Sequence, residues 1–370
     1  SIRRQRQMCI RDSIMSVRVK FLGGVRTVTG SCHFLGDGET GLLVDCGLYQ
    51  GRRDEAFARN AGFSVDPAGI DALVLSHAHI DHSGNIPTLV RKGFRSRIVT
   101  TDATRDLCTA MLPDSGHIQE EDIKYVNKIH ARKGLPPREP LYTRKDAERS
   151  LEYFSGHPYH QKINIGDGVS VTFYDAGHVL GSATPLIEFE NGGAPVRIGY
   201  AVDLGRKNIP ILNDPERPPE IDYLFLESTY GGRLHGDIKK VRKIFADTIS
   251  KTVARGGSII IPSFALERTQ EIAYGLKLGI ESGRIPDIPV YVDSPLAVNV
   301  TEVFIRHPEC YDEEMYELFR AGEDPLGANK FHYITDVEDS KRLNEDPRPK
   351  IIISAAGMCE AGRILHHLKN

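Results

Sequence analysis

Ser76-His77-Ala78-His79-Ile80-Asp81-His82 is the most informative stretch of this chain, because it crowds three imidazoles and one carboxylate into seven positions. The apolar run just before it predicts a buried strand. Side chains alternate along an extended segment, so we expect His77 and His79 to point to the same side. Asp81 and His82 should come from the turn into the next helix. Nitrogen and oxygen ligands packed this densely are typical of zinc sites. The stretch can hold two ions, one bound by His77 and His79 and the other by Asp81 and His82.

Composition limits the classes of function. The 370 residues suffice for two domains with full cores. A formal net charge of -3 means that any polyanion site must be a local patch. The six cysteines include no C-x-x-C pair, which argues against a disulfide framework and predicts a reducing, cytoplasmic location. No apolar run is long enough to span a bilayer, so we expect no membrane partner.

Residues 1–14 fit poorly with the rest of the chain. They begin with a basic segment that lacks the apolar stretch of a secretory signal. We expect a non-native or disordered extension, with Met15 as the natural start. A basic nucleic-acid arm is the alternative.

Strand-rich patterns run from Ser16 to about residue 202. Strands are predicted at residues 17–21, 31–35, 42–44, 71–76, 163–165, 169–174, 184–190 and 196–202. Helices are predicted at residues 86–92 and 104–131, the second ending before a Gly-Leu-Pro-Pro breaker. Two β-rich blocks flanked by helices predict an α/β fold, a sandwich of two sheets covered on the outside.

After about Ile221 the pattern changes to apolar strands that alternate with helices, which predicts parallel βα units. Four strands of this part end in a serine, namely Ser228, Ser263, Ser294 and Ser354. The last three are predicted to lead into helices at residues 265–280, 296–306 and 359–368. Serine is a good N-cap. Helix N-termini gathered at one sheet edge also form an anion site, so we expect these serines to hold phosphates.

Two zinc ions need more donors than the first stretch supplies, and strand ends in the second β-rich block are the place to look. His178 follows the predicted strand at 169–174, and Gly177 before it lets the backbone turn sharply. Asp203 ends the strand at 196–202 and can bridge both ions. The predicted metal ligands are therefore His77, His79, Asp81, His82, His178 and Asp203.

Three further residues are candidates for roles around this site. Asp45 ends the predicted strand at 42–44 and is expected to orient a ligand imidazole or the metal-binding loop. His157 and His160 are rivals for the third-ligand role. They lie in a polar segment that contains proline, with no predicted strand before them, so we expect both to be surface histidines.

These residues together resemble the metallo-β-lactamase superfamily. Asp45 matches its first motif, the stretch at residues 76–82 its second, His178 its third and Asp203 its fourth. Four segments are similar to motifs of the β-CASP nucleases, namely residues 178–183, 227–231, 262–271 and 354–358. The resemblance covers residues 17–370 and is to the bacterial and archaeal RNA-processing members and to the endonuclease subunit of the eukaryotic cleavage and polyadenylation factor.

The resemblance implies an αββα sandwich over residues 15–225, with an inserted Rossmann-like parallel α/β cap, the β-CASP domain, over residues 226–370. In that family the sandwich resumes after the cap and brings two more histidine motifs. The resemblance therefore implies that the cap is truncated and that the closing strands lie outside this sequence, which leaves the second ion short of a ligand and puts the activity of this piece in question. His366 and His367 are expected on the last helix, facing solvent or phosphate.

The activity that the resemblance implies is zinc-dependent hydrolysis of RNA phosphodiester bonds, with two Zn²⁺ and single-stranded RNA as the partner. Asp81 would accept or orient a proton of the attacking water, and Glu227 would orient a leaving-group histidine from the absent segment. Arg268 joins the four serines as an expected phosphate contact. A homodimer is compatible with the sequence.

Other functions stay open at this point. They are a small-molecule metallo-hydrolase of the same fold, a non-catalytic RNA-binding subunit, and a nuclease acting on DNA. The strand–serine–helix pattern of the last third disfavours the first. The presence of all six ligand-type residues disfavours the second.

Overall fold

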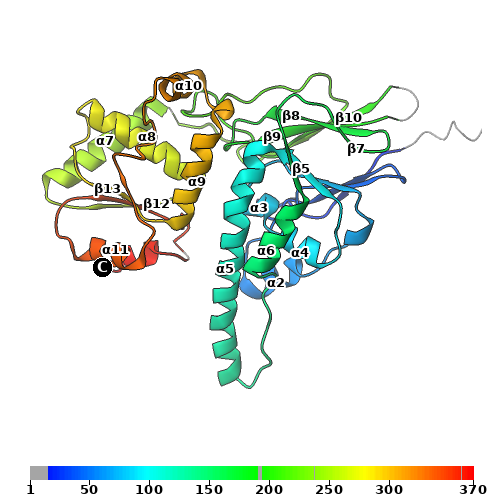
Figure 1. The fold of residues 1–370 in the computed structure, drawn as a ribbon, viewed down its shortest axis with the longest axis horizontal. Helices are drawn as coiled ribbons and strands as arrows, with labels where there is room; N and C mark the ends of the chain where they lie inside the picture. The colour runs from blue at the N-terminus through cyan, green and yellow to red at the C-terminus, as the bar shows by residue number, and fades with distance from the viewer. Residues whose placement is uncertain (1–15, 191–193, 237, 360) are drawn as a thin grey trace, which may run out of the picture. The chain divides into compact units, whose positions relative to one another are not determined.

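The apolar run before the histidine stretch forms strand β4 (Ala72–Val74) in the computed structural model of the chain, which describes residues 16–190, 194–236, 238–359 and 361–370 (Figure 1). This strand lies inside a six-stranded mixed sheet of order β1-β2-β3-β4-β5-β6. Its other strands are β1 (Arg18–Phe21), β2 (His33–Gly36), β3 (Gly41–Val44), β5 (Arg97–Thr101) and β6 (Phe154–His157). The strands from β3 to β6 run parallel, so their carboxyl ends share one edge.

A second mixed sheet has five strands in the order β11-β10-β9-β8-β7. They are β7 (Ile163–Gly166), β8 (Val169–Asp175), β9 (Ala183–Phe189), β10 (Val196–Ala201) and β11 (Tyr223–Leu226). Buried side chains of both sheets, such as Val44, Val74, Val171 and Ile187, form one apolar core. The predicted pair of packed sheets is therefore confirmed.

Helices accompany the six-stranded sheet. They are α2 (Arg53–Asn60), α3 (Ile80–Ser83), α4 (Ile86–Arg91), α5 (Asp102–Arg132) and α6 (Arg144–Ser150), with short 3₁₀ turns η1 (Pro67–Gly69) and η2 (Leu151–Tyr153). The sequence patterns did not predict strands β5 and β6, which the structure contains. The β-branched run at residues 98–101 carries the signal for β5, whereas Phe-Ser-Gly-His in β6 has no strand pattern of its own.

A third sheet holds four parallel strands in the order β12-β15-β13-β14. Its strands are β12 (Ile259–Pro262), β13 (Val290–Val292), β14 (His332–Tyr333) and β15 (Ile351–Ser354). Its helices are α7 (Ile238–Ala254), α8 (Arg268–Glu281), α9 (Pro295–Arg306), α10 (Glu313–Arg320), α11 (Val337–Glu345) and α12 (Ile364–His367), with the 3₁₀ turn η3 (Pro308–Cys310). The predicted parallel α/β part is confirmed.

The chain divides into two units, each with its own apolar core. The first holds most residues up to Glu227. The second holds Ser228–Asn370 together with two short loops, Gly177–Leu180 and Leu204–Pro215. The predicted extension at residues 1–14 lies outside the described residues. No helix in the described part of the chain is long and apolar enough to cross a membrane.

Two predictions for the last third are wrong. The strand that ends before Glu227 does not join the parallel sheet: it is β11, which pairs with β10 in the five-stranded sheet. A parallel edge strand has the same apolar pattern in either sheet, so sequence alone could not separate them. The helix predicted at residues 359–368 is only α12, because the backbone has positive φ at Cys359 and Gly362 and cannot stay helical there.

Candidate metal centre

Four side chains meet beyond the ends of β4, β8 and β10. His77, His79, His178 and Asp203 each offer one ligand atom, and these atoms all lie within 4.8 Å of one another. Nε2 of His77 lies 3.1 Å from Nδ1 of His79 and 3.8 Å from Oδ2 of Asp203. The structure thus brings four of the six predicted ligands into a group that is able to hold a metal ion.

Asp81 and His82 lie in the short helix α3 rather than in an open turn. Nε2 of His82 is 3.9 Å from Oδ2 of Asp81 and 3.5 Å from Oδ1 of Asp203. The two oxygens of Asp203 therefore face different imidazoles, Oδ2 towards His77 and Oδ1 towards His82. This carboxylate lies between the two sets of donors.

Asp45 is fully buried behind this group. Its Oδ2 accepts a hydrogen bond from Nδ1 of His82 at 2.8 Å, and its Oδ1 accepts one from the backbone N–H of Ser76 at 2.8 Å. A carboxylate that holds Nδ1–H of an imidazole leaves Nε2 as the nitrogen that can bind a cation. The backbone of Asp45 has φ of 56°, a left-handed conformation that aspartate and asparagine tolerate better than most residues.

Ser76 was missed by the sequence reasoning, although it opens the stretch at residues 76–82. Its Oγ donates to Oδ2 of Asp45 at 3.0 Å and lies 3.0 Å from Nδ1 of His77. A hydroxyl has one proton to give, so Ser76 must accept from Nδ1–H of His77. Asp45 thereby sets the tautomer of both imidazoles: that of His82 directly, and that of His77 through Ser76.

A second set of polar groups was also missed. Oγ of Ser31 lies 3.3 Å from Oδ2 of Asp45 and 3.1 Å from the Tyr200 hydroxyl, which in turn lies 2.6 Å from Nδ1 of His33. Burial raises the pKa of Tyr200 well above its usual value, so the phenol stays protonated. Nothing in the local sequence signals these contacts, because Ser31 and Tyr200 are 169 positions apart.

Backbone hydrogen bonds hold the metal-binding loop from behind. The N–H groups of Ser31, Cys46 and Leu48 donate to the carbonyls of Asp81, His82 and Ile80, at 2.8, 2.8 and 3.0 Å. A Cβ atom on Gly47 would lie 1.6 Å from the Asp81 carbonyl oxygen, so this close approach requires glycine. The loop is therefore shaped by the protein itself.

The electrostatics favour a cation. Burial by itself lowers the pKa of His82, but the charge and hydrogen bond of Asp45 and the charges of Asp81 and Asp203 outweigh it and raise this pKa to about 9. Three carboxylates around one buried imidazole stabilise positive charge there, whether it is a proton or a metal ion.

Three other residues considered in the sequence analysis, Glu227, His160 and His157, lie outside the group of four metal-binding side chains. Glu227 follows β11, is half-buried, and donates its backbone N–H to the Ala201 carbonyl at 3.2 Å, which puts it beside the end of β10. His160 is exposed and lies 2.8 Å from Glu216, as expected of a surface histidine. His157 is half-buried and ends β6, where its Nε2 contacts Ser155 at 2.9 Å.

The predicted serine caps are confirmed at Ser294 but not at Ser263 or Ser354. Of the four serines, only Ser294 caps a helix in the described part of the chain, since its Oγ accepts from the N–H of Ala297 at the start of α9. Ser263 and Ser354 are buried, and their hydroxyls bond to Phe264, Thr269 and Asp293 inside the unit. Ser228 is exposed and follows a strand of a different sheet.

Two other expected contacts also differ. Arg268 is exposed at the start of α8 and pairs with Glu271 at 2.5 Å. His366 is exposed, but His367 is buried, with Nε2 2.6 Å from Asp293 and Nδ1 2.7 Å from Asn344. The prediction that His367 faces solvent or phosphate is wrong, because the buried carboxylate of Asp293 needs polar partners.

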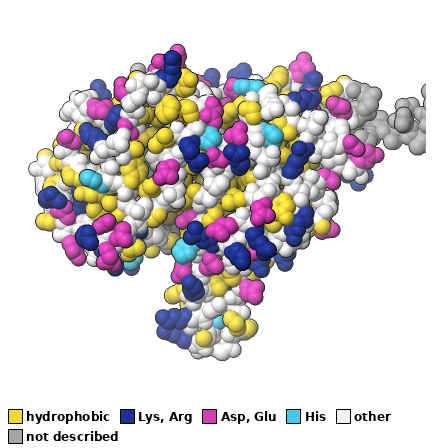
Figure 2. Space-filling view, in the orientation of Figure 1, with side chains coloured by type: hydrophobic (Ala, Val, Ile, Leu, Met, Phe, Trp, Pro, Cys, Tyr) yellow, Lys and Arg dark blue, Asp and Glu magenta, His cyan; other side chains and the backbone are white. Residues whose placement is uncertain are grey.

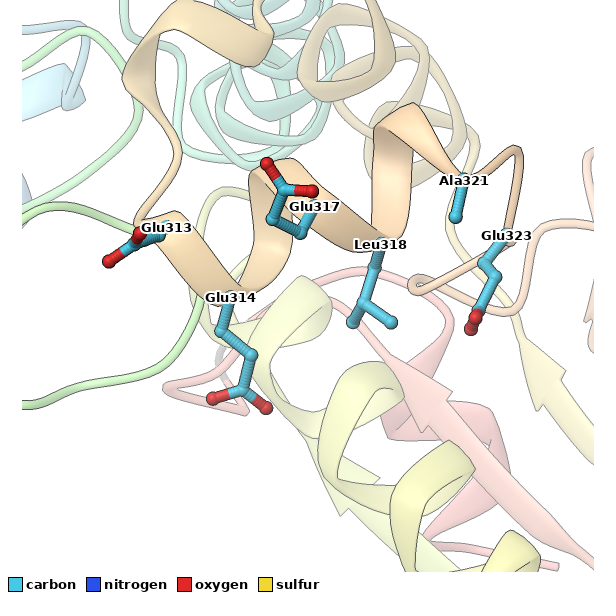
Figure 3. A pocket seen from close by; sticks show the side chains of 6 residues that line it. All are labelled: Glu313, Glu314, Glu317, Leu318, Ala321 and Glu323. Carbon is cyan, nitrogen blue, oxygen red and sulfur yellow. The ribbon is translucent and has the colours of Figure 1, made fainter.

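A hollow of about 710 Å³ lies along α10, and Figure 3 shows the side chains that line it. They are Glu313, Glu314, Glu317, Leu318, Ala321 and Glu323. Four carboxylates repel phosphate, so this hollow does not suit a nucleic acid.

Comparison with known proteins settles the family. A model of the metallo-beta-lactamase superfamily matches residues 25–165, and a model of the Beta-Casp domain matches residues 269–370. Ribonuclease TTHA0252 of Thermus thermophilus is 35% identical over 355 residues, which cover 96% of this chain and 76% of that protein. The chain belongs to the metallo-β-lactamase superfamily, β-CASP group. The resemblance read from the motifs is confirmed.

Two further relatives are named a transcription termination factor and an RNase J-like protein. Transcription termination factor FttA of Methanocaldococcus jannaschii is 29% identical over 360 residues, covering 96% of this chain and 54% of that protein. An RNase J-like protein of the same organism is 29% identical over 361 residues, covering 95% of this chain and 74% of that protein. The chain thus spans about half the length of the FttA protein it matches and about three quarters of the other two.

Proposed function

We propose that this chain forms the catalytic part of a zinc-dependent ribonuclease that hydrolyses phosphodiester bonds of single-stranded RNA. The observation that supports this most is the convergence of His77, His79, His178 and Asp203 within 4.8 Å, in a chain 35% identical to a protein named a ribonuclease. Three imidazoles and a carboxylate match the donors that zinc takes in hydrolases.

The donor set fits two ions. His77, His79 and His178 would hold the first, Asp81 and His82 the second, and Asp203 both. The hydrogen bond from His82 to Asp45 supports this, because metal-binding imidazoles commonly donate their other N–H to a carboxylate. Zinc bound there would act as a Lewis acid and bring the pKa of water close to neutrality.

The chain's own residues would prepare the reaction. Asp81 would accept a proton from the attacking water or hold it in line. Asp45 and Ser76 keep Nδ1–H of His82 and His77 occupied, so that both Nε2 atoms face the reacting side. Glu227 would orient the group that protonates the leaving oxygen.

Binding of RNA outside the reacting centre remains part of the proposal. Arg268, Ser228 and Ser294 are proposed phosphate contacts, since each is exposed or at a helix start. We also propose a reducing, cytoplasmic setting, because the thiols of Cys32, Cys46, Cys108 and Cys359 form no disulfide.

The decisive experiment uses the longest natural form of the protein, loaded with zinc. We expect about two zinc ions per chain by mass spectrometry and cleavage of labelled single-stranded RNA that chelation abolishes. His79→Ala should lose both, whereas His160→Ala, a matched change at an exposed histidine, should lose neither. Zinc-free protein that still binds RNA would support the non-catalytic binding subunit, and turnover of a lactam or thioester but not of RNA would support the small-molecule hydrolase.

A further inference from the structure

Helix α5 (Asp102–Arg132) carries a feature that the metal centre does not use. Its 31 residues make it about 46 Å long, and its lower end extends beyond α2, α4 and α6 (Figure 1). The chain then returns along this end through a segment rich in proline. We call residues 120–138 the α5 arm.

The α5 arm has a net positive charge, whereas the whole chain has a net negative charge. Residues 120–138 contain five Lys and Arg against three acidic residues, which are all at positions 120–122, whereas the whole chain has a formal charge of -3. Lys124, Lys128 and Arg132 are spaced by four, so they follow one helix face at steps of about 6 Å. All three are exposed, as is Lys133, and dark blue side chains gather at the arm in Figure 2.

Three of the five cations of the arm form no ion pair with the residues that the structure describes. Lys124 pairs with Glu121 at 2.5 Å, and Arg138 pairs with Asp54 at 2.8 Å. Lys128, Arg132 and Lys133 form no ion pair with any residue that the structure describes. Cations in a last helical turn offset the helix dipole. That explains Arg132 and Lys133 but not the continuation of the row to Lys124, two turns earlier.

The arm is held rigid. The side chain of Asn127 both donates to the carbonyl of Arg138 at 2.9 Å and accepts from its N–H at 2.8 Å. Nδ1 of His130 lies 2.7 Å from the carbonyl of Pro136. A ligand that binds such a preformed surface need not order it first, which lowers the entropic cost of binding.

An aromatic ring accompanies the charges. Tyr125 is 58% exposed, one residue from Lys124 and three from Lys128. Arg53 lies 6.0 Å from the centre of this ring. Exposed aromatic rings among cations are how proteins without sequence preference bind single strands, through base stacking and phosphate contacts together.

We propose that the α5 arm binds the backbone of single-stranded RNA through Lys128, Arg132 and Lys133, with Tyr125 as a stacking surface. This inference rests on the proposed RNA substrate. The far end of α5 lies near the reacting side, since Thr104 donates to the Gly181 carbonyl at 2.8 Å. From Thr104 to Arg132 the helix covers about 42 Å, which about 12 nucleotides cover at the stacked spacing of 3.4 Å, and fewer nucleotides cover in an extended strand.

The test compares the full chain with the triple variant Lys128→Ala, Arg132→Ala, Lys133→Ala. Binding of a fluorescent single-stranded RNA of about 30 nucleotides is measured by anisotropy over a range of salt, in chelator. Each phosphate contact adds about 0.7 to the salt slope. We expect the salt slope of the variant to fall by about 2 and its affinity at low salt to fall at least tenfold. Tyr125→Ala should weaken binding without changing the slope.

The matched control is Lys92→Ala, Lys145→Ala, Arg149→Ala, which removes three exposed cations of the same unit that are not part of the arm. It should retain the slope of the unmodified chain. An unaltered slope in the arm variant, an equal loss in the control, or binding of phosphatidylserine vesicles in place of RNA overturns the proposal. Because chelator prevents cleavage, a chain that binds RNA through the arm but never cuts it would refute the proposed activity alone.

Discussion

A Cβ atom on Gly205 would lie 1.6 Å from the carbonyl oxygen of Gly177. The turn after β10 therefore touches the turn after β8 so closely that only a hydrogen atom fits between them. These turns carry Asp203 and His178, whose strands are separated in the sheet by β9. A backbone contact between two glycines thus sets the spacing of two candidate ligands.

Gly205→Ala should separate these turns and weaken zinc binding. The added methyl group meets backbone rather than a movable side chain, so one turn must shift by more than 1 Å. We expect a loss of zinc affinity of about 10- to 100-fold, measured by competition with a chromophoric chelator. Gly232→Ala, where the added atom meets nothing within 4 Å, is the control. Equal affinities of the two variants would contradict the role of this contact.

Asp45→Asn should disturb the tautomers of the metal-binding imidazoles. Asparagine tolerates the left-handed backbone at this position, but its amide offers one acceptor atom where the carboxylate offers two. We expect zinc affinity to fall about 10- to 100-fold. In nitrogen NMR of the zinc-bound protein, His82 should lose its single, protected Nδ1–H signal. Asp71→Asn, at a carboxylate that accepts from Gly41 near the protein surface, should leave both readouts intact. An unchanged Nδ1–H signal in Asp45→Asn would refute the assignment.

Asp81→Asn should separate metal binding from catalysis. The amide can still contact a cation but accepts no proton from water, so cleavage of labelled RNA by the zinc-loaded, longest natural form should fall at least about 100-fold. The thermal unfolding midpoint should stay close to that of the unmodified protein, as it should for the control Asp37→Asn. Turnover at the unmodified rate would exclude Asp81 from proton transfer.

Asp293 should make the second unit sensitive to acid. Burial raises its pKa, but hydrogen bonds from His367, Ser340 and Arg363 outweigh burial and hold it below the usual value. A carboxyl with a depressed pKa in the folded state stabilises above its unfolded pKa, about 4, and loses that contribution as pH falls through the folded value.

Asp293→Asn should therefore lower the urea midpoint clearly at pH 7, since breaking a buried ion pair costs about 3–5 kcal/mol. The difference from the unmodified chain should shrink as pH falls from about 5 to 3. Asp336→Asn, at an exposed helix cap, should show a much smaller difference at pH 7. A difference for Asp293→Asn that is constant with pH would contradict the proposed linkage.

Sequence patterns located the candidate ligands because each follows a strand or glycine turn that local residues predict. His77 and His79 lie on one short stretch, and His178 and Asp203 each follow an apolar run that the structure confirms as β8 and β10. Local patterns therefore place each ligand at a strand end. They do not bring the two pairs together, because β4 belongs to the six-stranded sheet and β8 and β10 belong to the five-stranded one.

The supporting groups could not be found in this way. Tyr200 reaches Ser31 only because two sheets pack face to face. Ser263 looks like a helix cap, yet α8 begins only after Glu267, which has φ of 64° and accepts from the backbone of Leu180. His367 is buried where its Nε2 contacts the carboxylate of Asp293, 74 positions earlier in the sequence. Each outcome depends on a partner distant in sequence, which local propensity does not register.

The hydrogen bonds from Ser31, Cys46 and Leu48 to the loop at residues 80–82 have a consequence for how the protein acquires its metal. Because these backbone hydrogen bonds hold the path of the loop, we expect the chain to fold first and take up ions afterwards. Its metal content would then depend on which divalent ion the cell supplies at that moment, since affinities alone favour copper over zinc. Protein recovered from cells grown on different metals should carry different ions on the same fold.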